Sequence, residues 1–114
     1  MQIRYSESVA TNKKQCNNKK LLVRAYGSRR AELILQRLDE LHAAETLETL
    51  RFLPQARCHE LKGNHEGKLS VDLDHPYRLL FKPTNNPVPL KPDQGLDWSR
   101  VTEIEILGVE DTHG

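Results

Sequence analysis

The stretch that decides the fold is CHELKGNHEGKLSVDLDHPYRLLFKP, from Cys58 to Pro83. Between Lys68 and Leu73 apolar residues alternate with polar ones, which is the period of a half-buried β-strand. Asp74-His75-Pro76 supplies turn residues, and a second strand-like run continues to Lys82. We therefore predict a β-hairpin. Its second strand places Tyr77, Leu79 and Phe81 on one face and Arg78, Leu80 and Lys82 on the other.

Upstream of the hairpin, the pattern predicts a strand over Ala56–Leu61, followed by a glycine-bounded turn over Lys62–Gly67. Earlier still, Gln2–Tyr5 alternates in character and is expected to form a short strand. Downstream, four prolines predict an irregular loop, which we treat as an insertion at about residues 83–100. A last strand is expected near Val101–Val109, with a bulge at Gly108.

Two helices are expected between the first and second strands. Asn17 and Asn18 are good N-cap residues for the first helix, Gly27 is placed to end it, and Ser28 to cap the second. The face of the first helix that packs is Leu21, Leu22, Ala25 and Tyr26. The apolar stripe of the second is Ala31, Ile34, Leu35, Leu38 and Leu41, and its solvent side is Arg30, Glu32, Arg37, Asp39 and Glu40. The predicted order is β, α, α, β, β, β, β, an α+β fold.

Composition limits the classes of protein. A chain of 114 residues fits one domain, so we expect residues 1–114 to fold together. No apolar run is long enough to cross a bilayer and the first residues are too polar for a signal peptide, so we expect a cytoplasmic protein without a membrane partner. Cys16 and Cys58 do not form a disulfide framework and are interpreted as structural or incidental.

The formal charge of +1 argues against a protein that coats nucleic acid indiscriminately. The charge is unevenly distributed, because the segment between Glu7 and Glu32 contains basic residues and no acidic one. These are Lys13, Lys14, Lys19, Lys20, Arg24, Arg29 and Arg30. The patch is either a solvated helix face or a contact for RNA phosphates or an acidic partner protein.

The Cys58–Pro83 stretch closely resembles the HigB-type branch of the RelE/ParE toxin superfamily. The resemblance rests on His59, on Leu61-Lys62-Gly63, on Leu69-Ser70-Val71 and on Tyr77-Arg78-Leu79-Leu80-Phe81. It implies a RelE/ParE-like fold, in which an N-terminal strand and a two-helix hairpin pack on a small, mainly antiparallel sheet. It also implies a toxin of a type II toxin–antitoxin system that cleaves messenger RNA on the ribosome and is neutralised by a cognate antitoxin, with operator DNA bound only through the antitoxin complex.

The residues are suited to this chemistry without a cofactor. RNA carries its own nucleophile in the 2′-hydroxyl, so cleavage needs a base, an acid and cations for the phosphate. The resemblance assigns His59 and His113 as the proton-transfer pair, without saying which is the acid, and Asp111 as a carboxylate that orients a histidine. Thr112 stands where the family often has a tyrosine.

Arg78 is the first candidate for gripping the phosphate, because an arginine between apolar strand positions needs an anion or solvent for its head. A structural salt bridge with Asp72 across the hairpin is the competing interpretation. Weaker candidates for RNA binding are Lys62, His65, Lys68 and Lys82. The spacing of Cys58, His59, His65 and His75 does not match a zinc site, so no metal is expected.

Two other functions remain open. One is a ParE-like toxin that binds a protein target such as DNA gyrase and has no cleavage chemistry. The other is an inactive relative that acts as a binding partner, which Thr112 and the near-neutral charge would suit.

Overall fold

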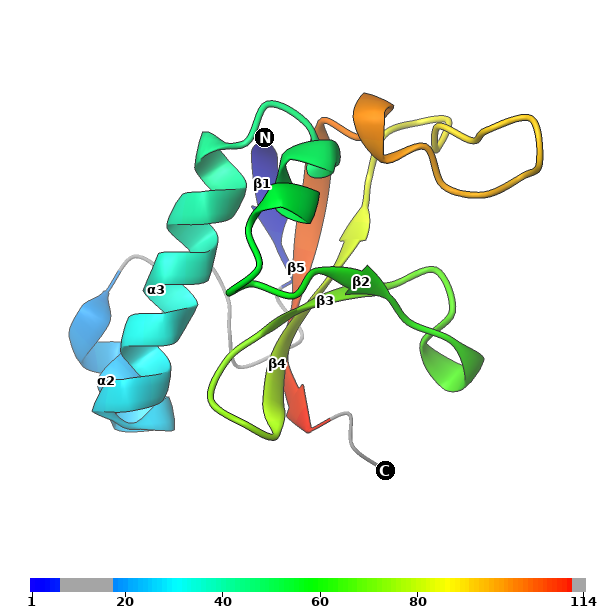
Figure 1. The fold of residues 1–114 in the computed structure, drawn as a ribbon. Coiled ribbons are helices and arrows are strands. Elements are labelled where there is room, and N and C mark those ends of the chain that lie inside the picture. Colours follow the sequence, from blue (N-terminus) through cyan, green and yellow to red (C-terminus); the bar gives the residue numbers. More distant parts are fainter. Residues whose placement is uncertain (7–17, 112–114) are drawn as a thin grey trace.

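The computed structural model of the chain describes residues 1–6 and 18–111, and these contain a five-stranded sheet in the order β1-β5-β4-β3-β2. The outermost strands are β1 (Gln2–Tyr5) and β2 (His59–Glu60); between them lie β5 (Glu103–Asp111), β4 (Tyr77–Pro83) and β3 (Leu69–Asp72). β1 is parallel to β5, and the remaining pairs are antiparallel. The predicted α+β class, hairpin and mainly antiparallel sheet are confirmed (Figure 1).

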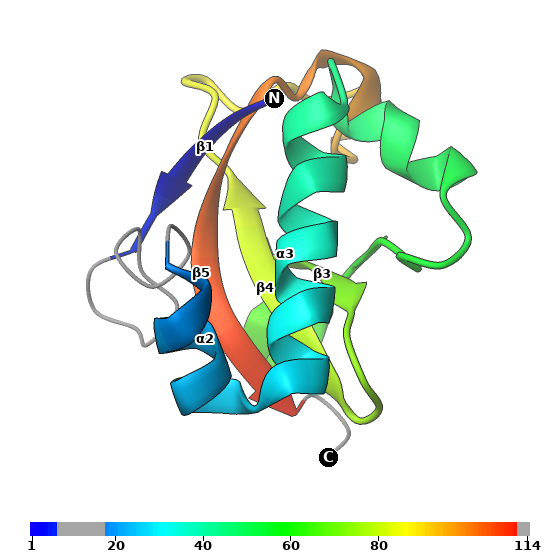
Figure 2. The ribbon, with the colours of Figure 1, turned by 90° about the vertical axis from the view of Figure 1, so that its left-hand side faces the viewer.

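One face of this sheet is covered by the helices α2 (Lys19–Tyr26) and α3 (Ser28–Ala43), as Figure 2 shows. The side chain of Asn18 accepts hydrogen bonds from the backbone N–H groups of Lys20 and Leu21, so the predicted cap of α2 is confirmed. Ser28 is not the cap of α3. Gly27, at a φ of 83°, both ends α2 and precedes α3, because only glycine adopts that backbone without strain.

The core lies between α3 and the sheet. Buried side chains from the helices meet those of the inner strands, and they include Leu22, Ala31, Ile34, Leu38, Leu41, Val71, Leu79, Phe81, Ile104 and Ile106. The predicted stripe of α3 is confirmed apart from Leu35, which is only partly buried. In α2, Ala25 is exposed although we predicted that it packs.

Arg37 is the main error in the predicted faces of α3. It was expected on the solvent side, yet it is only 5% exposed. Its Nε donates to the backbone carbonyl of Asp72 at 2.7 Å, and its Nη2 donates to that of Gln55 at 2.9 Å. Burial of the guanidinium is tolerated because both carbonyl groups accept hydrogen bonds from it and because it also pairs with Glu40.

Strand β2 is shorter than the predicted Ala56–Leu61. Arg57 has a φ of 44°, which interrupts extended backbone immediately before His59. Upstream of it, a 3₁₀ helix η1 (Leu47–Phe52) that the sequence pattern did not indicate follows α3. In the predicted turn after β2, residues Gly63–His65 form another such helix, η2.

The downstream half follows the prediction closely. Leu80 pairs with Gly108 and Phe81 with Ile106, so β5 carries an extra residue at the predicted bulge. The proline-rich loop is irregular apart from a bridge between Leu90 and Leu96, and it ends in the 3₁₀ helix η3 (Trp98–Arg100). In the described part of the chain, no helix has the length and apolar character that crossing a membrane requires.

Candidate functional site

The candidate site lies on the sheet face that α2 and α3 leave uncovered, which we call the open face. Paired strand residues point to the same side, so two rows of side chains can be read from the strand register. One row is His59, Ser70, Leu80 and Gly108; the other is Asp72, Arg78 and Glu110. Ser70 and Leu80 are buried in the floor of this face. His59 and Arg78 are therefore on the same side of the sheet.

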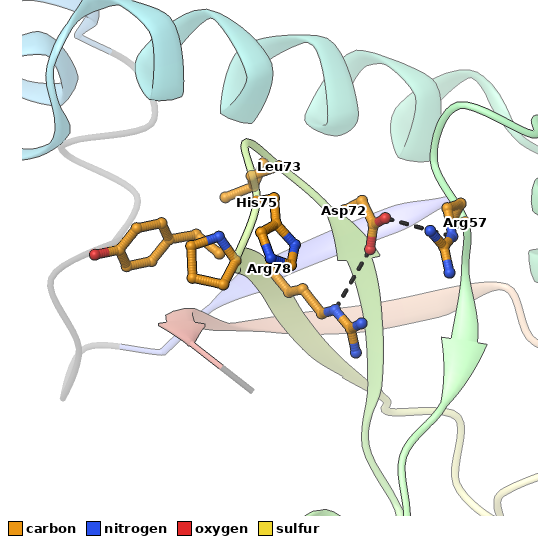
Figure 3. Close-up of a pocket in the computed structure, with 7 residues that line it drawn as sticks. Arg57, Asp72, Leu73, His75 and Arg78 are labelled. Atoms are coloured by element: carbon orange, nitrogen blue, oxygen red, sulfur yellow. Dashed lines mark ion pairs between the residues drawn. The ribbon is translucent and has the colours of Figure 1, made fainter. Parts of the chain in front are cut away.

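Four side chains form a cluster on the open face: His59, Asp72, Arg78 and Arg57. Arg78 Nη1 lies 3.4 Å from His59 Nε2, and Arg78 Nε lies 3.4 Å from Asp72 Oδ1. Asp72 Oδ2 is in turn 3.5 Å from Arg57 Nε, so the carboxylate stands between two arginines (Figure 3). The predicted salt bridge of Arg78 with Asp72 is thus present together with the contact to His59.

Burial and the charges of the cluster together set the pKa of His59 below its ordinary value. Burial lowers the pKa of this imidazole, and the nearby charges of Arg78 and Arg57 lower it further, while Asp72 acts in the opposite direction. The neutral form is favoured at neutral pH. Because Arg78 only donates hydrogen bonds, the contact at Nε2 suits an imidazole whose lone pair is on that atom. His59 can accept a proton at that atom once the guanidinium of Arg78 turns from it to a bound anion.

Arg57 is the functional candidate that sequence reasoning missed. It lines two hollows: one of about 210 Å³ beside Arg78, drawn in Figure 3, and one of about 340 Å³ beside His59. Its side chain is 72% exposed, and only its Nε faces Asp72. The sequence could have indicated Arg57, because a strand through Ala56–Leu61 places residues 57 and 59 on the same face.

The predicted RNA-binding residues lie outside this cluster. Lys62 and His65 are in the turn after β2, where Lys62 is exposed and His65 is partly buried. Lys68 and Lys82 come together at the far ends of β3 and β4, where both line a hollow of about 450 Å³. Within residues 1–6 and 18–111, none of these three lysines makes an ion pair.

The structure does not bring Asp111 to the cluster. Asp111 pairs with Tyr77, so it belongs to the helix-covered side, whereas Glu110 shares the row of Arg78. His113 and Thr112 lie outside the described residues. The catalytic roles assigned to Asp111 and His113 remain predictions.

The basic patch resolves into two parts. Lys19, Lys20, Arg24 and Arg29 are exposed on α2 and α3. Arg30 pairs with Asp74 at 2.9 Å and covers the ring of Tyr77, so its role is structural. The remaining lysines of the patch, Lys13 and Lys14, lie outside the described residues, as do Cys16 and Asn17.

Comparison with known proteins identifies one family. The family model of the RelE-like toxin of type II toxin–antitoxin system HigB matches residues 14–91. That range contains all four residues of the cluster and ends before β5. No curated protein matches the chain.

Proposed function

The chain belongs to the HigB family of RelE-like toxins of type II toxin–antitoxin systems, and from this premise we propose that it is a metal-independent endoribonuclease that cleaves messenger RNA on the ribosome. Membership also implies a cognate antitoxin protein as its partner. We further propose that operator DNA is bound only through the complex with that antitoxin.

The observation that carries this proposal is the contact between His59 and Arg78 on the open face, with the pKa of His59 held low. A neutral imidazole takes the proton from the 2′-hydroxyl, and the 2′-oxygen attacks the adjacent phosphorus. The bond from phosphorus to the 5′-oxygen breaks, and an acid returns a proton to that oxygen. The products are a 2′,3′-cyclic phosphate and a 5′-hydroxyl.

The arginines supply the positive charge that the transition state needs. Both face Asp72 through Nε, an arrangement that keeps the Nη groups of Arg57 available to a phosphate. Asp72 holds the two guanidinium groups in place before RNA arrives, which reduces the reorganisation needed on binding. Since His59 suits the base, His113 is the candidate acid. Lys62 and His65 would contact RNA from the turn after β2.

The test is to induce the chain and map transcript ends in cells. His59→Ala and Arg78→Ala should each reduce cleavage by roughly 10²–10³-fold, the usual effect of removing a proton-transfer group or an oxyanion donor. His42→Ala and Arg29→Ala remove the same residue types from exposed positions of α3 and should cleave normally. Purified protein should cleave a translated message and leave the same RNA intact without ribosomes.

A ParE-like toxin that binds a protein target such as DNA gyrase predicts the opposite pattern. Growth would arrest while transcripts remain intact, and His59→Ala would still be toxic. Either result would overturn the proposed cleavage while leaving the family membership unchanged. An inactive relative would not arrest growth at all.

A further inference from the structure

The proline-rich insertion forms one wall of a hollow that the proposed cleavage does not use. Figure 1 shows this loop projecting from the end of the sheet, on the side away from α2 and α3. The hollow has a volume of about 450 Å³ and lies between the insertion and the ends of β3 and β4. Its lining includes Lys68, Lys82, Val88, Leu90 and Leu96.

The insertion wall is apolar and is held in place. Val88 and Leu90 are each 42% exposed and are among the few large hydrophobic residues that reach solvent in the described part of the chain. The hydrogen bonds that hold the backbone of this loop include Lys91 N to Gly95 O, Asp97 N to Pro89 O, and Arg100 Nη2 to Leu90 O. The wall is therefore preformed, although Val88 and Leu90 do not belong to the core.

The sheet wall carries two lysines that are not in an ion pair among the described residues. Neither Lys68 nor Lys82 makes an ion pair with any described residue. Two carboxylates, those of Glu60 and Glu66, also border the hollow. Glu60 accepts a hydrogen bond from the indole Nε1 of Trp98 at 3.1 Å, and both carboxylates keep acceptor capacity. Two ammonium groups, an apolar surface and two carboxylate acceptors match the phosphate, the ring and the amino group of a nucleotide.

The hollow and the cluster lie along the same strand, β4. Lys82 follows Arg78 by four residues on the same face of β4, which places their Cα atoms about 13 Å apart. An extended RNA strand with its cleaved phosphate at Arg78 would continue along β4 to Lys82. We propose that the hollow binds a nucleotide flanking the cleaved one, with its phosphate on Lys68 and Lys82 and its base against Val88 and Leu90. This inference rests on the proposed function, because it takes Arg78 as the site of cleavage.

The experiment measures RNA binding to the purified full chain at low salt. The probes are short RNAs that carry a 2′-deoxy sugar at the cleaved nucleotide, extended stepwise at the 5′ or the 3′ end. Extension in one direction should raise affinity. Lys82→Ala and Lys68→Ala should each remove that gain and lower the slope of log affinity against log salt by about 1. Leu90→Ser should weaken binding of the extended RNA by roughly fivefold and leave the slope unchanged.

Lys91→Ala is the matched control, because Lys91 is in the same loop but does not line the hollow. It should bind both RNA lengths like the unchanged protein. The proposal is overturned if extension gives no gain, if the gain survives in all three variants, or if Leu90→Ser loses antitoxin binding while RNA binding is unchanged. Failure of the proposed function looks different: His59→Ala and Arg78→Ala would then leave cleavage of the unmodified message intact.

Discussion

At the residue scale, the charged side chains of the cluster act in opposite directions on the pKa of His59. Asp72 favours the protonated form of His59, whereas Arg78 and Arg57 oppose it, and burial has the largest effect. The same carboxylate pairs with both arginines. Asp72 therefore has two roles: it positions the cations and it limits how far they lower the pKa of His59.

This balance predicts how the cleavage rate depends on pH. If His59 is the base, the rate falls as the pH drops through its pKa, which lies below the ordinary value of 6.5. Asp72→Asn removes a negative charge, so the acid limb should move to lower pH. Arg57→Gln removes a positive charge, so the limb should move to higher pH, by less because Arg57 is mostly exposed. The measurement is the single-turnover rate against pH.

Asp39→Asn is the control, because it removes the same charge as Asp72→Asn from the exposed side of α3. Its acid limb should coincide with that of the unchanged protein. Shifts of Asp72→Asn and Arg57→Gln in the same direction would exclude His59 as the titrating base.

At the scale of secondary-structure elements, Arg37 joins three parts of the chain that hold the cluster. It extends from α3 and donates to the carbonyl groups of Gln55 and Asp72. The first lies two residues before Arg57, and the second belongs to a residue of the cluster itself. A buried arginine on the helix-covered side thus fixes the backbone beneath residues of the open face.

Replacing Arg37 should damage both stability and cleavage. Arg37→Met removes the donor from two partly buried carbonyl groups and should lower the free energy of unfolding by about 2–5 kcal/mol. Cleavage should fall further than the folded fraction does, because Arg57 and Asp72 lose their support. Urea unfolding followed by circular dichroism measures the first effect. Arg29→Met, at an exposed position of the same helix, should change stability by less than about 0.5 kcal/mol; equal losses would contradict the assigned role.

The elements that sequence predicted well are those set by local patterns. Alternation across Lys68–Leu73 and helical spacing in α3 specify which face is buried, and Gly108 marks the bulge. What failed depends on contacts between distant segments. The burial of Arg37 requires the carbonyl groups of Gln55 and Asp72, which helical spacing does not reveal.

The candidate site was predictable to a similar extent. His59 and Arg78 share a face because alternation along paired strands requires it. We did not predict which side of the sheet Asp111 occupies, although the sequence analysis placed the bulge that decides it at Gly108. Without the extra residue at the bulge, Asp111 would lie on the side of Arg78; with it, the phase reverses and Glu110 takes that row.

At the scale of the whole molecule, folding and proposed activity use opposite faces of one sheet. The core fills the helix-covered side, and the cluster and the lysines lie on the other. Trp98 connects the insertion to this core: it is 4% exposed, its ring lies under Arg51, and its indole N–H donates to Glu60. The loop is thus tied to the fold at its C-terminal end.

Because the core and the cluster lie on opposite faces, we expect substitutions in the core to lower stability and substitutions in the cluster to lower cleavage. Trp98→Ala should lower the free energy of unfolding by about 3–5 kcal/mol, a large part of the roughly 5–15 kcal/mol typical of a domain. Trp98→Phe keeps most of the packing and loses one hydrogen bond to an exposed carboxylate, so about 0.5–1.5 kcal/mol is expected. His59→Ala should stay within about 1 kcal/mol of the unchanged protein, while cleavage falls by roughly 10²–10³-fold. Urea titrations monitored by circular dichroism, run beside cleavage assays, measure both properties. If Trp98→Ala unfolds at the same urea concentration as the unchanged chain, the insertion is not held by the core.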